Sequence, residues 1–170
     1  MAREILFKAK RIDNGEWVEG SLINAKNYTC ILDNNTDDMY YPHLDGDLGT
    51  IDGKATPIIP DTICQYTGLT DKNGNKIWEN DVVWYQFDGN SGDDTKAVIR
   101  HAKYSNGGNK DCYLGFYVDW QEIVQKRKDI GFWVYQRDIE VIGNIFDNPE
   151  LLEGTPVNGY ADQCGLMSAT

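Results

Sequence analysis

The stretch that decides the fold is Gln65–Val83, which reads QYTGLTDKNGNKIWENDVV. It opens with a β-prone run, passes through the turn-forming residues Asp71–Asn75 (DKNGN), and leads into a second β-prone run that begins at Asp81. An Asn-Gly pair between two such runs predicts a tight hairpin turn, because both residues accept positive φ at little cost. The short carboxylate of Asp81 is expected to hydrogen-bond the backbone amides of this turn. We therefore predict that a β-hairpin organises this part of the chain.

Strand signals continue outward from this hairpin on both sides, mostly as short apolar runs with a period of two. The predicted strands are 5–9, 17–22, 28–32, 63–69, 81–87, 97–101, 113–118 and 139–145. Two short helices are expected, one over 120–129 that ends at Gly131 and one over 148–152 with a proline at its first position. The chain is thus predicted to be mainly β.

Prolines at 57 and 60 mark a seam between two halves of the chain. We predict an N-terminal β subdomain over 1–60 and a second β subdomain over 61–153. Residues 154–170 are small and polar without any periodicity, which is typical of a tail. The polar stretches 33–56 and 88–112 read as long loops, where recognition residues are often placed.

The chain is acidic, with 16 Lys and Arg against 27 Asp and Glu among 170 residues and a formal net charge of −11. The acid is spread along the chain, with one local excess at 33–52. Duplex DNA binding relies on cations that displace counterions from phosphates, so this charge argues against a duplex DNA partner. No apolar segment has the length of a membrane span or a signal peptide, so no membrane association is predicted and a cytoplasmic protein is expected.

Known catalytic and metal-binding patterns are missing from the sequence. The four cysteines are 34 or more residues apart, and neither His43 nor His101 has zinc-ligand spacing from any of them, so free thiols are expected. Two Asx-rich turns, at 33–38 and 71–76, lack the glycine and glutamate that a calcium loop requires. We therefore predict no catalytic, cofactor-binding or metal-binding residues. One alternative stays open, a carboxylate-based enzyme that uses Glu79 and Asp81.

The aromatic residues are the most informative surface candidates. Trp84 and Tyr85 alternate along one predicted strand and so face opposite sides of the sheet, and Tyr117 lies on another strand. One side of each strand must be core, whereas the other can form a binding platform. Trp84, Tyr85 and Tyr117 are therefore our candidate binding surface.

The Gln65–Val83 stretch resembles the signature of the YopX family of phage and prophage proteins, in which QYTGL, DKNG and a following acidic strand run together. The start of the chain, Arg3–Ala9, and its strand followed by Asn-Pro-Glu-Leu, Ile139–Leu151, match the beginning and end of that family in the same order. The residues that carry the signature are Gln65, Tyr66, Gly68, Asp71, Asn73, Gly74, Glu79 and Asp81. The resemblance implies an N-terminal β region followed by an SH3-like β-barrel, a phage or prophage origin and the cytoplasm of a bacterial host. It implies no activity.

These observations favour a non-enzymatic accessory protein that binds another protein and forms a homo-oligomer, since β scaffolds with exposed strand edges and many aromatics are suited to association. A second hypothesis is single-stranded nucleic-acid binding through an aromatic face of the barrel. The carboxylate-based enzyme is the third.

Overall fold

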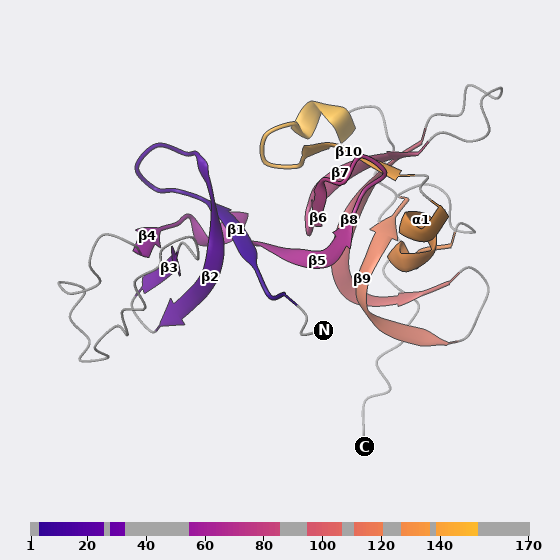
Figure 1. Cartoon of the computed structure of the whole chain (residues 1–170), viewed down its shortest axis with the longest axis horizontal. Coiled ribbons are helices and arrows are strands. Elements are labelled where there is room, and N and C mark those ends of the chain that lie inside the picture. The colour runs from indigo at the N-terminus through magenta and orange to yellow at the C-terminus, as the bar shows by residue number, and fades with distance from the viewer. Residues whose placement is uncertain are drawn as a thin grey trace, which may run out of the picture. The chain divides into compact units, whose positions relative to one another are not determined.

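The computed structural model describes residues 4–25, 28–32, 55–85, 95–106, 111–120, 127–136 and 139–152. Within these ranges the chain forms two antiparallel sheets, which confirms the prediction of a mainly β protein (Figure 1). The acid-rich stretch 33–52 and the predicted tail 154–170 lie outside the described residues. The chain divides into two compact units, Met1–Tyr66 and Thr67–Thr170. The division falls inside a strand rather than at the proline seam.

The first unit is built from β1 (Phe7–Lys10), β2 (Trp17–Ala25), β3 (Tyr28–Leu32), β4 (Ala55–Pro57), a 3-10 turn η2 (Pro60–Thr62) and the first half of β5 (Cys64–Thr70). Its strands lie in the order β4-β3-β2-β1-β5. β1 and β2, both predicted as strands, form a hairpin with Gly15 at φ +73° in the connecting turn. The small core consists of Ala9, Ile31 and Ile58, with Phe7, Val18, Leu22 and Ile63 packed against it.

The second unit contains the second half of β5, β6 (Lys76–Trp78), β7 (Asp81–Tyr85), β8 (Thr95–Ser105), β9 (Cys112–Asp119), α1 (Ile130–Gln136), β10 (Ile139–Asn144) and a 3-10 turn η3 (Pro149–Leu152). Four of its strands form a sheet in the order β10-β7-β8-β9. β6, which the sequence did not suggest as a strand, pairs with β5 after the DKNGN turn, so the second strand of this hairpin begins at Lys76 and not at Asp81 as predicted.

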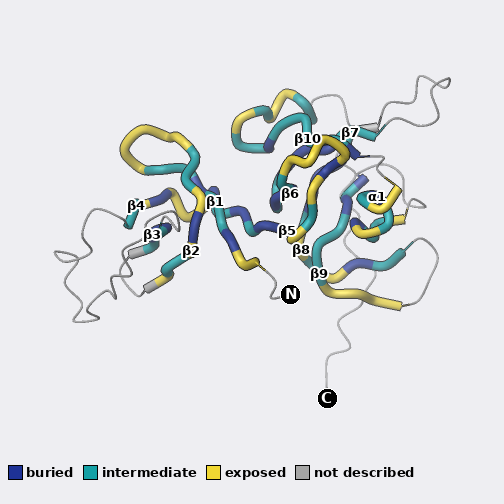
Figure 2. Tube along the Cα trace, in the orientation of Figure 1, coloured by how far each residue is buried: buried dark blue, intermediate teal, exposed yellow. Residues whose placement is uncertain are grey.

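An apolar cluster on one face of the four-stranded sheet holds the second unit together. It joins β6–β10 to the helix through Ile77, Val83, Ala97, Ile99, Val118, Trp120, Ile130, Trp133 and Ile139. Burial varies along β8 (Figure 2): Ala97–Ile99 are buried, His101 is exposed and Tyr104 is buried again.

The helix prediction was wrong in its position. Most of the predicted helix, 121–126, lies outside the described residues; its ends, Trp120 and 127–129, are not helical, and α1 begins at Ile130, where the predicted helix was to end. The reason is a cap: the Asp129 carboxylate accepts a hydrogen bond from the Gly131 backbone N–H at 3.0 Å, which satisfies a free amide in the first turn. Gly131 thus lies near the start of the helix. The short turn of helix expected over 148–152 is present as η3.

No closed barrel is found among the described residues, since both sheets are open in strand order. The SH3-like barrel therefore stays a prediction. The cysteine expectation holds in part, because Cys30 and Cys64 are free and buried, and burial raises the pKa of the Cys30 thiol. Cys112 differs from the expectation, since it is disulfide-bonded.

A steric test of the first unit is available at Gly20. A Cβ atom at this position would lie 1.8 Å from the Leu32 carbonyl oxygen on β3. We expect Gly20→Ala to lower the free energy of unfolding by about 2 kcal/mol or more, because backbone must move to admit the methyl group. Thermal unfolding followed by circular dichroism measures the change.

Gly115→Ala is the matched control, because Gly115 has nearly the same φ (+157° against +159°) but nothing within 4 Å of its Cβ position. Any backbone cost common to the two positions therefore cancels in the comparison. Equal unfolding temperatures for the two variants would contradict the close β2–β3 approach described here.

Candidate functional site

The carboxylate of Asp71 is the hub of the signature turn. Its Oδ1 accepts hydrogen bonds from the backbone N–H of Asn73 at 2.9 Å and of Asn75 at 2.8 Å. Its Oδ2 accepts one from the Asn75 side-chain amide at 3.1 Å and one from the Val141 backbone N–H at 3.0 Å. Asp71 is only 7% exposed. One carboxylate therefore shapes the turn and also ties it to β10.

The pKa of Asp71 is consistent with these four hydrogen bonds. Burial by itself would raise the pKa of Asp71, but hydrogen bonds from Val141, Asn75 and Asn73 outweigh it and hold the pKa below the usual range. Neighbouring Lys72 strengthens the attachment, because its Nζ lies 2.6 Å from Glu140 Oε2 on β10 and 5.0 Å from the centre of the Trp84 ring. The turn is therefore fixed to β10 by several polar contacts.

Asp81 forms a second buried clamp. It is 1% exposed, and its Oδ2 accepts a hydrogen bond from the Trp78 backbone N–H at 2.8 Å. The prediction that Asp81 bonds the amides of the Asp71–Asn75 turn was wrong, because Asp71 accepts those bonds. Its Oδ1 accepts a bond from the Asn144 side-chain amide at 2.9 Å. The tight turn between Trp78 and Asp81 places Asn80 at φ +66°, where its N–H donates to the Ile99 carbonyl at 2.8 Å. Asp81 thus connects the β6–β7 turn to the end of β10.

The remaining signature residues support the same local structure. Gln65 is paired with Phe7 of β1, and the Tyr66 N–H donates to the Leu6 carbonyl at 2.9 Å. Gly68 and Gly74 have φ of +84° and +85°, which glycine adopts readily. Of the Asn73-Gly74 pair, only Gly74 has positive φ, so the sequence-based expectation was wrong for Asn73. Glu79, half-buried, lies in the β6–β7 turn.

The structure does not bring the three candidate binding residues together. Tyr85 packs into the helix-side core, with ring centres 4.8 Å from Trp133 and 5.9 Å from Trp120. Trp84 occupies the opposite face of β7, beneath Lys72 and paired with Glu140 of β10. Tyr117 is separate from both, on β9. Only Tyr117 belongs to a larger cluster of accessible aromatic rings.

That cluster, the tyrosine face, consists of Tyr104 on β8 and Tyr113 and Tyr117 on β9. The ring centre of Tyr104 lies 5.2 Å from that of Tyr117, in a stacked arrangement, and 5.6 Å from that of Tyr113. Tyr104 is buried, whereas Tyr113 is 41% exposed and the adjacent Leu114 is 73% exposed. Burial, and next the charge of Asp129, raises the pKa of the Tyr104 hydroxyl. A buried ring thus supports accessible ones.

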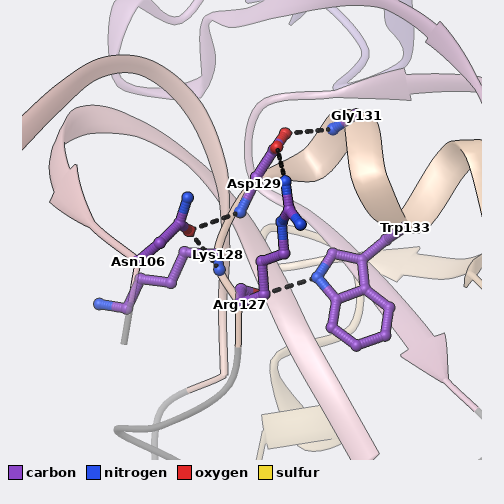
Figure 3. Close-up of polar contacts among 6 residues, drawn as sticks. All are labelled: Asn106, Arg127, Lys128, Asp129, Gly131 and Trp133. Atoms are coloured by element: carbon purple, nitrogen blue, oxygen red, sulfur yellow. Dashed lines mark hydrogen bonds and ion pairs between the residues drawn. The ribbon is translucent and has the colours of Figure 1, made fainter. Parts of the chain in front are cut away.

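Residues 127–129 form a short segment that is bonded to Asn106, just after β8, and leads into α1 (Figure 3). The Asn106 side-chain oxygen accepts hydrogen bonds from the backbone N–H of Lys128 at 2.9 Å and of Asp129 at 3.2 Å. The Arg127 carbonyl accepts bonds from the indole N–H of Trp120 and of Trp133, at 3.0 and 2.7 Å.

Two cationic side chains of the 127–129 segment lie on aromatic rings. Lys128 Nζ is 5.5 Å from the Tyr117 ring centre, and the Arg127 guanidinium is 4.5 Å from that of Phe132. Sequence analysis missed this segment because it read the residues as helix. The signal that could have found it is Asp129 directly before the apolar run IGFWVY, a usual pattern for a helix N-cap.

Every buried side-chain nitrogen or oxygen in the described ranges has a hydrogen-bond partner. Within the same ranges, no three His, Cys, Asp or Glu side chains are grouped so that they could hold a metal ion. No helix in this part of the chain is long and apolar enough to cross a membrane.

The chain is a mainly β protein of two units. Its signature residues Asp71 and Asp81 hydrogen-bond the chain itself and so stabilise the fold. A family model described as YopX protein matches residues 6–153, and the chain belongs to this family. Among solved structures, the chain is similar to the crystal structure of protein EF1440 from Enterococcus faecalis. The identity is 24% and the TM-score 0.51, over 89% of this chain and 100% of that one. This likeness supports the fold. No curated protein matches the chain.

The Asp71 hub predicts a specific loss of stability. We expect Asp71→Asn to lower the free energy of unfolding by about 2–4 kcal/mol, because an amide nitrogen would face the N–H donors of Val141 and Asn75. Chemical denaturation measures the change. Asp13→Asn is the control, since Asp13 forms an exposed ion pair with Arg11 and should have little effect. Equal effects of the two substitutions would contradict the role of Asp71.

The lowered pKa of Asp71 also predicts a pH dependence. Because the folded pKa lies below the unfolded one, the stabilisation is complete above about pH 5 and is lost as pH falls through the folded pKa. The stability difference between the wild-type chain and Asp71→Asn should therefore shrink below about pH 4. Denaturation curves from pH 3 to 7 test this, and a difference that stays constant over the whole range would argue against it.

Proposed function

We propose that the chain is a non-enzymatic protein-binding β module, and that the tyrosine face with the adjoining edge of β9 is its binding surface. The observation that carries the proposal is the exposure of Tyr113 and Leu114 beside the buried, stacked ring of Tyr104. Tyrosine rings supply large contact areas at low entropic cost, and their hydroxyls tolerate water, so tyrosine is enriched at protein interfaces.

The two buried acids of the signature support a role in folding rather than in catalysis. Both carboxylate oxygens of Asp71, and both of Asp81, accept hydrogen bonds from the chain itself. An acid or base that acts on a substrate needs a lone pair or proton within reach of it. We therefore favour binding over the carboxylate-based enzyme.

The proposal includes an accessory role in a phage or prophage, action in the cytoplasm of a bacterial host, and a barrel of the SH3-like type in the second unit. These parts are supported by the family resemblance alone. Single-stranded nucleic acid is the second candidate partner, because Lys128 beside the Tyr117 ring is the kind of pair that stacks an unpaired base and contacts its phosphate. The net charge of −11 favours a protein.

Site-specific photocrosslinking in a bacterial host tests the proposal. A benzophenone amino acid at position 113 should crosslink a discrete protein, whereas the same group at Ile12, which is exposed on the first unit, should not. Leu114→Ser should weaken the crosslink at position 113, because it removes exposed apolar surface beside it.

Two outcomes would contradict protein binding through this surface. One is the absence of any adduct at position 113, or the same adducts from positions 113 and 12. The other is binding of labelled single-stranded RNA or DNA in fluorescence anisotropy at low salt, which Tyr113→Ala and Tyr117→Ala abolish. That second result would establish the nucleic-acid hypothesis in its place.

A further inference from the structure

The outer edge of β9 carries backbone groups that point away from the sheet. β9 is the last strand in the order β10-β7-β8-β9, and its Val118 N–H donates outward to the Lys128 carbonyl at 2.9 Å. Because such groups alternate along an antiparallel strand, the N–H and C=O of Leu114 and Phe116 point the same way. In the described part of the chain no segment lies beside the Leu114 groups, whereas Phe116 adjoins the Tyr117–Asp129 bridge. The outer edge of β9 is therefore open at Leu114 and covered at Tyr117 and Val118.

This edge lacks the usual protection against strand addition. Cys112–Val118 (CYLGFYV) contains no charged residue, although the chain as a whole is strongly charged. Leu114, in the middle of the stretch, is 73% exposed. Natural edge strands are commonly blunted by lysine, proline or a bulge, and none of these is present between Cys112 and Val118.

The chain itself shows that the edge accepts another strand. Residues 127–129 run antiparallel to β9 beside Tyr117 and Val118, through the Tyr117–Asp129 bridge and the bond from Val118 to Lys128. This short segment leaves β9 where α1 begins at Ile130. Any further strand can therefore occupy the edge only up to Phe116.

We infer that the open edge pairs with the same edge of a second copy of this chain, antiparallel, with the two-fold axis beside Leu114. This inference rests on the proposed function and names the partner for it. In this register the N–H and C=O of Leu114 bond reciprocally to those of the second copy's Leu114. Phe116 then marks the limit of the pairing, which avoids the 127–129 segment.

The side chains of the edge favour a second copy over an unrelated peptide. The register places Tyr113 opposite the second copy's Gly115, and the reverse pair forms by symmetry. Gly115 has nothing within 4 Å of its Cβ position, so it offers open space to an aromatic ring. On the other face, two exposed Leu114 side chains cover each other. Both kinds of cross-strand contact stabilise antiparallel pairs.

The net charge of the chain predicts how this dimer responds to salt. Two chains that each carry −11 repel one another at a distance, whereas the paired strands themselves are uncharged. Salt screens the repulsion and leaves the backbone bonds and apolar contacts largely intact. The dimer should therefore become tighter as ionic strength rises.

Light scattering coupled to size exclusion, on the full chain, tests the inference. At about 100 μM, a concentration that reveals dissociation constants in the micromolar range, we expect twice the 19.3 kDa of one chain. Leu114→Lys should weaken the dimer at least about tenfold, because it places a cation on the two-fold axis and repels its own copy. Ile12→Lys is the matched control, since Ile12 is 64% exposed, lies in the first unit outside β9, and should leave the dimer intact.

Circular dichroism and thermal unfolding establish that the Leu114→Lys chain is folded. Leu114→Pro is a second variant with the same expected effect, because it removes the outward N–H without removing a bond to β8. A monomeric wild-type chain at high salt, or a dimer that Leu114→Lys leaves unchanged, would overturn the inference. A crosslink from position 113 to a different protein, together with a monomeric chain, would overturn the inference while leaving the proposed function in place.

Discussion

The second unit depends on one buried carboxylate. Asp71 lies in the turn of the β5–β6 hairpin, and its bond to Val141 crosses 70 residues of sequence to reach β10. Local turn geometry and long-range topology are thus satisfied by the same four hydrogen bonds. A neutral side chain of similar shape could not accept all of them, which explains why an acid occupies a buried position despite the cost of desolvation.

Asp81 repeats this arrangement at the other end of β10. It accepts bonds from the preceding turn and from Asn144, so β10 is held at Val141 and at Asn144 by acids that come from early in the unit. These contacts join residues that are far apart in the sequence. They hold β10 beside β7 in the observed register. The signature residues therefore serve the fold, and the binding surface must be sought elsewhere.

The sequence predicted much of the fold because its strongest signals are local. Most strands and the alternation of Trp84 and Tyr85 follow from turn chemistry and a period of two. The bond from Asp71 to Val141 could not be predicted, since nothing local indicates which distant amide a buried acid will meet. The tyrosine face was found only at Tyr117, because its stacking with Tyr104 depends on the register between β8 and β9.

The contrast between the two ends of β9 connects the fold to the proposed function. At Tyr117 and Val118 the edge is covered by the chain's own 127–129 segment, which the Arg127 carbonyl fixes through two tryptophan N–H groups. At Leu114 no described segment lies along the same edge, and the strand there is uncharged and apolar. A few more extended residues after 127–129 would cover the whole edge of β9. A single lysine on β9 would also hinder the addition of another strand. An edge that is closed at one end and left open over the next residues has the properties of an interface, because only there does an added strand gain both backbone bonds and apolar contacts.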